Sequence, residues 1–424
     1  MKDTRLVIEV SCEGRNGLKT VGEIICNSAS SYAFKYDENW LANEDSFVLE
    51  PRMSDTGWYY SSDGLFPFMR DCMPDRWGCR LIDRALESKD DRLLDLQRRT
   101  SSYGDLFYFL AVDDNSRLGA LRYKIRGDKT FAGDYGITSP LLLDELGRLS
   151  YRFSDRDYDV SSVLFIQGSS MGGARPKAVL RLQDELWLAK FSSKKDEYNV
   201  PCWEYVNLLL AKDCGLDVPD FRLERLQDGK NVLLVKRFDR EGERRLHFVS
   251  CQTLLHATER ERRGYAELAA EFESNFDKPR ESLHELWKRA VFNVLVTNTD
   301  DHLKNHAILW KPDCGWLLSP LYDLESTPPS VSRDRIWCMG LFSGSDRELT
   351  VRKLFDACEY FNVSKDEALQ FLRDANNKIP TFKYYASKYG ISSREIQLMS
   401  GAYLHADREV SMQLAGQKEY KSES

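Results

Sequence analysis

The sequence lacks the features that mark membrane, zinc-finger and DNA-binding chains. It has no run of about 18 apolar residues, so we expect no membrane-spanning helix and no membrane partner. Its 10 cysteines form no CxxC pair and no zinc-finger spacing with histidine, which predicts reduced thiols in a cytoplasmic protein. The N-terminus shows no cleavage signature after its short apolar run, so no signal peptide is expected. A net charge of -7 argues against whole-protein attraction to nucleic acid.

The chain is a globular sequence of 424 residues, with 42% hydrophobic and 30% charged residues. That length suits two or three packed subdomains. Residues 1–60 are predicted to be rich in strands, at Leu6–Val10, Thr20–Ile25 and Ser46–Leu49, and a helix is predicted over Phe66–Leu86. The later part is predicted to be mainly helical, at 251–275, 283–297, 347–377 and 393–412. A β-rich lobe followed by a helical lobe, with polar motifs near their junction, indicates a cleft.

A glycine-rich loop, Gly168–Gly173, stands between a predicted strand at Val163–Gln167 and a predicted hairpin at 177–191. Small residues let the backbone approach a polyphosphate closely. No Gly-Lys-Ser/Thr follows, so the loop is not a Walker A motif. It fits a loop clamped over phosphates between two strands, as in protein kinases, although an ordinary flexible turn remains the alternative.

Lys190 ends the apolar run LWLAKF, and Glu204 lies near the start of the next predicted helix. An unpaired ammonium is costly to bury, so Lys190 is expected to face a cleft or solvent. An ion pair between Lys190 and Glu204 would hold the amine against nucleotide phosphates. The alternatives are a solvated strand end for Lys190 and a surface carboxylate for Glu204.

The densest signal is the segment from Asn298 to His306, which is polar at every position except Leu303. It separates an apolar helix from an apolar strand. Phosphoryl transfer needs an aspartate for the hydroxyl proton, and oxygen ligands for a metal ion. Asp300, Asn305 and Asp323 can supply this set, with Asp323 in the later segment SPLYDL.

His302 and His306 have the i, i+4 spacing of two zinc-binding histidines, but Leu303 replaces the glutamate of an HExxH motif. A zinc site is therefore not expected. We interpret His302 as a residue that braces the loop by holding its conformation. The alternative is a partly buried histidine with one backbone hydrogen bond and no further role.

Together, the segments GSSMGGARPKAVL, LAKF, VKRFDR, TNTDDHLKNHAIL and LSPLYDL resemble the HipA family of bacterial toxin kinases. The stretch LFPFMRDCMPDRWGCRLI is similar to the N-terminal subdomain of that family. The resemblance spans roughly residues 5–380. It implies an α+β, two-lobed protein-kinase-like fold, with an extra N-terminal subdomain on the β-rich lobe and a helical C-terminal lobe. The implied domains are 1–105 (HipA-type subdomain), 106–240 (nucleotide-binding lobe) and 241–424 (catalytic lobe).

The resemblance also implies roles for single residues, with ATP and Mg²⁺ as cofactors. Asp300 would be the catalytic aspartate, grouped with Lys190 and His302. Asn305 and Asp323 would hold Mg²⁺. Nucleotide binding would involve Ser169, Ser170, Met171, Gly172, Gly173, Lys190, Lys304, Tyr322 and, at the hinge beside the adenine, Lys236, Arg237 and Phe238. Ser170 corresponds to the autophosphorylated serine of the family, with Ser169 as an adjacent competitor.

The implied activity is Ser/Thr phosphorylation of a protein, possible targets being aminoacyl-tRNA synthetases. The implied partner is a HipB-like helix-turn-helix antitoxin, which would bring the chain to DNA only indirectly. Two alternatives stay open. One is a small-molecule or lipid kinase, since Asp-x-His-x-x-Asn is shared with lipid-kinase-like loops. The other is a non-enzymatic module that supports a repressor.

Overall fold

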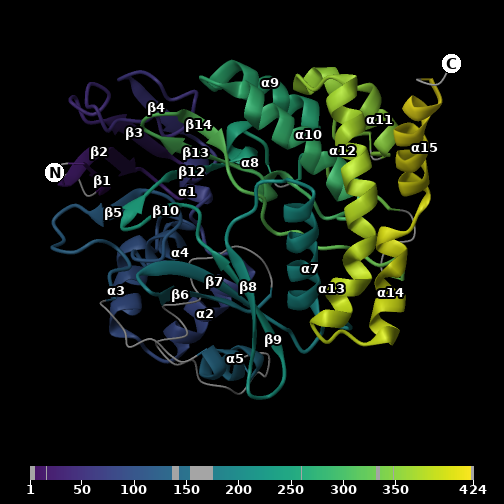
Figure 1. The fold of residues 1–424 in the computed structure, drawn as a ribbon. Helices are drawn as coiled ribbons and strands as arrows, with labels where there is room; N and C mark the ends of the chain where they lie inside the picture. The colour runs from purple at the N-terminus through teal and green to yellow at the C-terminus, as the bar shows by residue number, and fades with distance from the viewer. Residues whose placement is uncertain are drawn as a thin grey trace. The chain divides into compact units, whose positions relative to one another are not determined.

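The structure is a computed structural model that describes residues 5–15, 17–135, 143–152, 175–258, 260–330, 335–346 and 348–421. The glycine-rich loop, including Ser169, Ser170, Met171, Gly172 and Gly173, lies outside these ranges, as does the strand predicted at Val163–Gln167. The chain forms two compact units (Figure 1). Unit 1 comprises Met1–Lys195, Glu224–Val249 and Leu309–Asp313, and unit 2 comprises Asp196–Leu223, Ser250–Ile308 and Cys314–Ser424.

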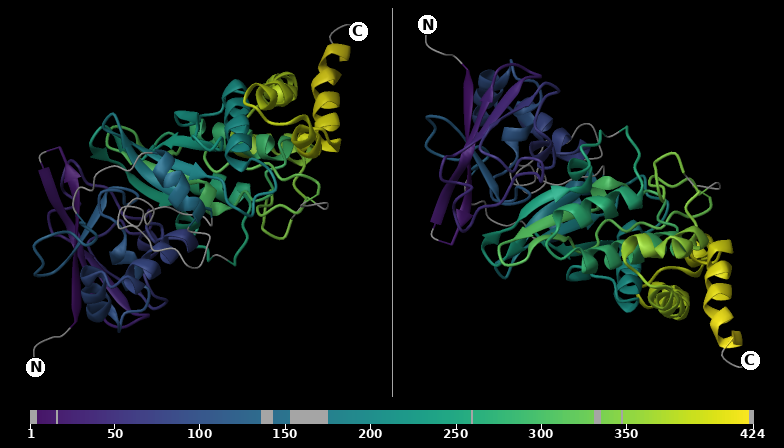
Figure 2. Two further views of the ribbon diagram at one scale, coloured as in Figure 1. Left: turned by 90° about the horizontal axis from the view of Figure 1, so that it is seen from below. Right: turned by 90° about the horizontal axis from the view of Figure 1, so that it is seen from above.

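Unit 1 begins with a five-stranded sheet in the order β4-β3-β2-β1-β5, and its first strands are the purple arrows of Figure 2. Its strands are β1 (Leu6–Gly14), β2 (Gly17–Cys26), β3 (Tyr32–Tyr36), β4 (Trp58–Ser61) and β5 (Leu121–Ile125). All four pairings are antiparallel. The strand predicted at Ser46–Leu49 is wrong: Leu49 is buried there, but the segment is irregular.

Four helices complete this part of unit 1. They are α1 (Pro67–Arg70), α2 (Arg76–Glu87), α3 (Asp91–Thr100) and α4 (Leu106–Ala111). The single helix predicted over Phe66–Leu86 is therefore two helices. Pro74 interrupts the run, because the residue before a proline disfavours helical dihedrals. Asp75 then caps α2 by accepting a hydrogen bond from the Gly78 N–H.

A second sheet, in the order β6-β7-β9-β8, confirms the predicted hairpin near residue 183. Its strands are β6 (Lys177–Leu182), β7 (Glu185–Phe191), β8 (Phe221–Arg225) and β9 (Asn231–Lys236). Gln183 and Asp184 both have positive φ, as a tight two-residue hairpin turn requires. Helix α5 (Leu143–Arg152) packs against β7, where Leu146 joins a core with Leu180 and Phe191.

Unit 2 is mainly helical. Its helices are α7 (Val200–Asp213), α8 (Cys251–Leu254), α9 (Tyr265–Asn275), α10 (Pro279–Leu295), α11 (Val351–Asp356), α12 (Lys365–Lys378), α13 (Phe382–Lys388), α14 (Ser393–Tyr403) and α15 (Ala406–Lys421). Further strands are β10 (Arg240–Glu241) and β11 (Arg244–Arg245), which belong to unit 1. Strands β12 (His247–Ser250), β13 (Ala307–Lys311) and β14 (Gly315–Leu318) form a sheet in the order β12-β13-β14. Strands β13 and β14 are neighbours in this sheet and form a hairpin.

Three of the long helices predicted in this region are broken, and the one expected over 393–412 is split at Leu404 into α14 and α15. The helix expected over 347–377 is split by Asn362, which has φ +57°, and α12 restarts with Ser364 and Glu367 in a capping box. The helix expected over 251–275 is likewise split into α8 and α9. No helix of the described ranges has the length and apolarity needed to cross a membrane.

Candidate active site

The polar segment 298–306 is held at both ends by buried elements of unit 2. It follows α10, in which Trp287, Ala290 and Val291 are buried, and it leads into the buried start of β13. The turn out of α10 is made by Thr297, whose φ is +53°. The Thr297 hydroxyl donates a hydrogen bond to the carbonyl oxygen of Ala402, at 2.7 Å. This hydrogen bond therefore holds the start of the segment 298–306 in place.

Asp300 is the acidic residue of this loop that faces solvent. Its neighbours Asn298, Thr299 and Asp301 are buried, whereas Asp300 is exposed. The Cys338 thiol donates to the Asp300 carboxylate, with Sγ and Oδ1 3.7 Å apart. Burial raises the pKa of Cys338, and the Asp300 charge raises it further, so the thiol stays protonated. Asp300 is thus exposed to solvent on a backbone that is otherwise buried.

A buried hydrogen-bond network holds the loop in place through the second aspartate. The Asp301 carboxylate accepts a hydrogen bond from the Tyr265 hydroxyl, and its Oδ2 lies 2.9 Å from Nε2 of His306. Asn293 extends the network to the Tyr265 hydroxyl oxygen, at 3.4 Å. Burial raises the pKa of Asp301, but the His306 charge and the hydrogen bonds from His306 and Tyr265 outweigh it and hold this pKa below the ordinary value. Asp301 therefore remains a buried carboxylate that orients the loop.

The structure places the two histidines differently from the sequence interpretation. His306, which is fully buried, contacts Asp301, whereas His302 lies half-buried at the start of the short 3-10 turn Leu303–Asn305. The His302 carbonyl accepts the Asn305 N–H at 2.8 Å. His306 is thus a brace that sequence reasoning missed. The role expected of His302 stays a prediction.

Asn305 and Lys304 are held against their neighbours by the same turn. The Asn305 side-chain amide donates to the Asp300 carbonyl oxygen, at 3.4 Å, which leaves Oδ1 as the atom able to ligate a cation. The Tyr322 hydroxyl donates to the Lys304 carbonyl oxygen, at 2.6 Å. This bond ties the loop to the segment that carries Asp323, so two of the predicted motifs are brought together within unit 2.

The segment around Asp323 is fixed by buried flanking residues. Leu321 and Leu324 are buried, and the Leu324 carbonyl accepts a hydrogen bond from the Asn207 side chain at 3.0 Å. Asp323 itself has φ +58°, a left-handed conformation that costs a non-glycine residue about 1–3 kcal/mol. Such backbone strain persists only where the surrounding contacts hold the residue in that conformation. The conformation in turn sets the direction of the Asp323 carboxylate.

Three carboxylates of unit 2 converge beside this segment. Ligand oxygens of Glu204, Asp323 and Glu325 all lie within 4.8 Å of one another, and Glu204 is buried. Glu204 comes from α7, and the other two come from the irregular segment after β14. Like charges so close repel, and a hard divalent cation relieves that repulsion. The oxygen-only donor set therefore fits Mg²⁺.

Sequence reasoning named Asp323 for this group but missed Glu325 and gave Glu204 another role. The available signal was the alternation in Asp323-Leu324-Glu325, which places two carboxylates on either side of a buried leucine. Glu204 belongs to unit 2 and Lys190 to unit 1. The ion pair expected between them therefore stays a prediction.

Lys190 lies in the central part of the second sheet of unit 1. It occupies β7 opposite Lys177 of β6 and Leu233 of β9, and its side chain is half-buried. Lys177 is buried near Asp75, with Nζ and Oδ2 3.7 Å apart. The position of Lys190 next to the end of β7 is the one that the pattern LWLAKF predicts.

The expected hinge residues lie at the end of β9 and directly after it. Lys236 forms an ion pair with Glu185, at 2.6 Å. Arg237 is buried, and its guanidinium contacts Asp239 at 2.6 Å and the Ser116 carbonyl at 2.9 Å. The ring of Phe238 stacks against Phe248. The Arg237 side chain is thus engaged within unit 1, and any contact of this segment with adenine would use its backbone.

The fold and the acidic loop are those of a kinase-like protein. The family description "HipA-like C-terminal domain" matches residues 169–381, and "HipA N-terminal domain" matches residues 15–103. The chain belongs to the HipA family of toxin kinases, as the motifs predict.

Relatives and a solved structure agree with this assignment. "Putative kinase Y4mE" of Sinorhizobium fredii is 26% identical over 353 residues, which are 76% of this chain and 77% of that protein. "Putative kinase Y4dM" of the same species is 27% identical over 159 residues, 34% of this chain and 38% of that protein. The match to Y4dM thus spans well under two thirds of that protein.

The solved structure is HipA of Shewanella oneidensis MR-1, in a complex with HipB and operator DNA. It matches with a TM-score of 0.66 and 17% identity, over 97% of both chains. At that identity the likeness shows the fold alone. The predicted α+β, kinase-like fold is confirmed. The domain boundaries expected at residues 105 and 240 stay predictions.

Proposed function

We propose that this chain is an ATP- and Mg²⁺-dependent Ser/Thr protein kinase that acts as a HipA-type toxin. The observation that carries the proposal is the convergence of Glu204, Asp323 and Glu325 in the unit whose loop presents Asp300 to solvent. A scaffold without chemistry has no need for three carboxylates within 4.8 Å of one another. Membership of a kinase family supports the same conclusion.

Asp300 is proposed to be the group that receives the substrate proton. Its carboxylate is exposed, and the buried Asp301 network fixes the backbone on its C-terminal side. In the proposed step the hydroxyl oxygen of a serine or threonine bonds to the γ-phosphorus of ATP. The bond from that phosphorus to the β,γ-bridging oxygen breaks, ADP leaves, and the hydroxyl proton passes to Asp300. No oxidant or reductant is needed.

Asp323 and Glu325, with Glu204 and the Oδ1 atom of Asn305, are the candidate ligands for Mg²⁺. The bound cation would neutralise phosphate charge during transfer. Mg²⁺ keeps waters and takes only a few protein oxygens, so not all four groups need to bind it at once. Lys190 and the backbone at Lys236–Phe238 are proposed to contact the nucleotide.

Regulation is proposed through Ser170 in the glycine-rich loop. A phosphoserine there would add about -1.5 to -2 charges beside the expected phosphate site, which would expel ATP. The partner is proposed to be a HipB-like antitoxin, since the Shewanella oneidensis HipA was solved with HipB and operator DNA. DNA would then be reached through the antitoxin.

The proposed activity is tested by incubating the purified chain with γ-labelled ATP and a cell lysate, with Mg²⁺ or with EDTA. We expect label in acid-precipitable protein, on phosphoserine or phosphothreonine, only with Mg²⁺. An Asp300→Asn preparation made in parallel reveals any contaminating kinase. Label in solvent-extractable or small-molecule products would instead indicate a lipid or metabolite kinase. Absence of transfer to any acceptor would favour the non-enzymatic module.

A further inference from the structure

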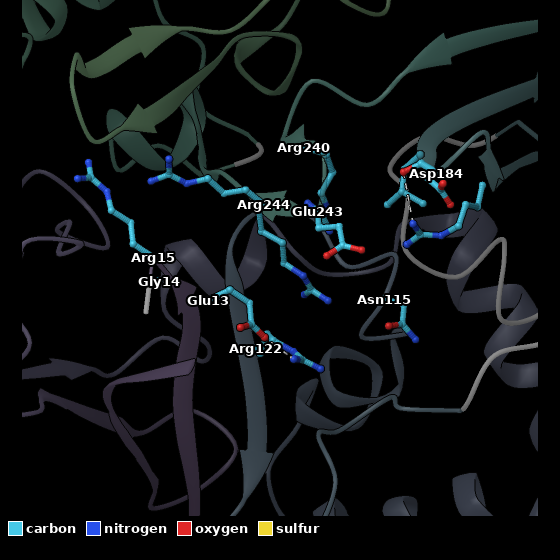
Figure 3. Close-up of a pocket in the computed structure, with 13 residues that line it drawn as sticks. Glu13, Gly14, Arg15, Asn115, Arg122, Asp184, Arg240, Glu243 and Arg244 are labelled. Carbon is cyan, nitrogen blue, oxygen red and sulfur yellow. Dashed lines mark hydrogen bonds and ion pairs between the residues drawn. The ribbon is translucent and has the colours of Figure 1, made fainter. Parts of the chain in front are cut away.

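A pocket within unit 1 is lined mainly by arginines (Figure 3). Its volume is about 580 Å³, within the range of small-molecule sites. The arginines are Arg15, Arg122, Arg181, Arg240, Arg244 and Arg245. Three acidic residues, Glu13, Asp184 and Glu243, also line it, so positive charge exceeds negative charge by three. All of these residues belong to unit 1, whereas the segment 298–306 belongs to unit 2.

Two of the arginines are engaged by carboxylates, of which Asp114 and Asp239 are buried. Arg122 contacts Asp114 at 2.6 Å and also Glu13 at 2.8 Å. Arg240 contacts Asp239 at 2.6 Å, and its side chain is buried. These pairs fix the guanidinium groups of the wall, because a buried arginine with two acceptors has little freedom to move. They form a rigid, positively charged surface.

Arg245 is the observation that points to a ligand. Its side chain is only 9% exposed, and its contact with Asp114 is long, at 3.5 Å. Its other terminal nitrogen, Nη1, is buried and has no hydrogen-bond partner among the described residues. A buried donor left without an acceptor costs about 1–3 kcal/mol, and more when it is charged. An anion bound in the pocket would add negative charge beside Arg245, whose contact with Asp114 is long.

Neighbouring arginines make the electrostatic potential around Arg245 more positive. Burial lowers the pKa of Arg245; Asp114 raises it, while the charges of Arg122 and Arg117 lower it again. Figure 3 shows Arg244, Arg122 and Asn115 directed toward the same open space. Arg244 is half-buried and forms no ion pair within the described ranges. Its guanidinium is therefore available to a bound anion.

We propose that this pocket binds a small oligophosphate through Arg244, Arg245 and Arg122. Planar guanidinium forks match phosphate oxygens in bidentate fashion. Several arginines around one space suit two or more linked phosphates better than a single carboxylate. Among the described residues the lining contains no aromatic side chain, and its apolar member is Leu186, so recognition rests on the phosphates and not on stacking of a base.

A nucleic-acid backbone is a less suitable occupant. The chain carries a net charge of -7, whereas nucleic-acid binding relies on many basic contacts spread along a surface. Single-stranded ligands are also usually held by aromatic stacking platforms, which this lining lacks. The concave shape and the concentration of charge in one place favour a compact polyanion.

The test is calorimetric titration of the full chain with pyrophosphate and with tripolyphosphate, in EDTA and without ATP, at matched ionic strength. We expect Arg244→Gln to weaken binding at least tenfold, which corresponds to loss of one charge-assisted contact. Arg181→Gln, at an exposed rim position, provides a second variant that leaves the buried pairs intact. Arg98→Gln on α3 is the matched control, because it removes the same charge outside the pocket.

The inference does not rest on the kinase activity, so the two can fail separately. Weakened binding in Arg244→Gln with unchanged binding in Arg98→Gln supports it, whether or not Arg181→Gln also weakens binding. It is overturned if neither probe binds the wild type, or if all three variants bind like the wild type. It is equally overturned if a short DNA duplex, and neither probe, binds in a manner that depends on Arg244.

Discussion

Tyr265→Phe tests whether the buried aspartate network holds the loop that presents Asp300. The substitution removes one hydroxyl and keeps the ring that packs edge-on against His306. Burial and the Asp301 charge raise the pKa of Tyr265, so its hydroxyl is a donor at every working pH. Asp301 would lose one of its two side-chain donors while remaining buried.

The expected loss of stability is about 2 kcal/mol, since a hydrogen bond to a buried charged group contributes about 1.5–3 kcal/mol. The contact of Asn293 with the hydroxyl is long, at 3.4 Å, and adds little. Urea unfolding followed by the helical signal measures the effect. For a slope near 2 kcal/mol/M the midpoint should fall by about 1 M.

The matched control is Tyr384→Phe, because Tyr384 is an exposed tyrosine of the same unit, 62% accessible. We expect its midpoint to stay within error of the wild type. Acid unfolding gives a second reading. The lowered pKa of Asp301 contributes stability that is complete above the ordinary value of 3.8 and is lost as pH falls through the lowered folded value. With one donor removed, the folded pKa of Asp301 lies closer to the ordinary value, so this pH-dependent contribution should become smaller. Equal behaviour of the two variants would refute the network.

Two further predictions concern the metal site and a buried histidine. Glu325→Gln should raise the Mg²⁺ concentration for half-maximal transfer about tenfold, because an amide is a weaker ligand than a carboxylate; Glu359→Gln, an exposed carboxylate elsewhere in unit 2, should leave it unchanged. Burial lowers the pKa of His247 from 6.5 to about 4. Between these pH values the unfolded chain binds a proton that the folded chain excludes. The free energy of unfolding should therefore decline as pH falls from 6.5 toward 4, by up to about 1.4 kcal/mol per pH unit. His247→Gln should flatten that slope in urea titrations across this pH range, and an unchanged slope would contradict the assignment.

The local elements could be predicted because their signals are local. The hairpin at 183–184 and the end of α7 at Gly215, which has φ +75°, follow from turn and cap chemistry within a few residues. The partner of β1 could not be predicted in this way. Residues 121–125 pair with β1 across more than a hundred residues of chain, and no local pattern encodes that contact.

The candidate site also contains residues that local sequence patterns identify and residues that only the tertiary structure identifies. Asp300, Asn305 and Asp323 stand out because polar residues interrupt apolar runs, and the family motifs contain them. Glu325 and the pairing of Asp301 with His306 depend on how buried segments meet in space. The same holds for Arg237, which reads as a basic hinge residue but is buried against Asp239. Side-chain pairing of this kind follows from tertiary packing and not from spacing.

The central claim is tested most directly by measuring nucleotide affinity and phosphate transfer in the same Asp300→Asn preparation. Asp356→Asn, at an exposed position at the end of α11, is the matched control. We expect Asp300→Asn to bind ATP and Mg²⁺ nearly as the wild type does while transfer falls by orders of magnitude, with both properties unchanged in Asp356→Asn. Transfer at the wild-type rate by Asp300→Asn would contradict the account.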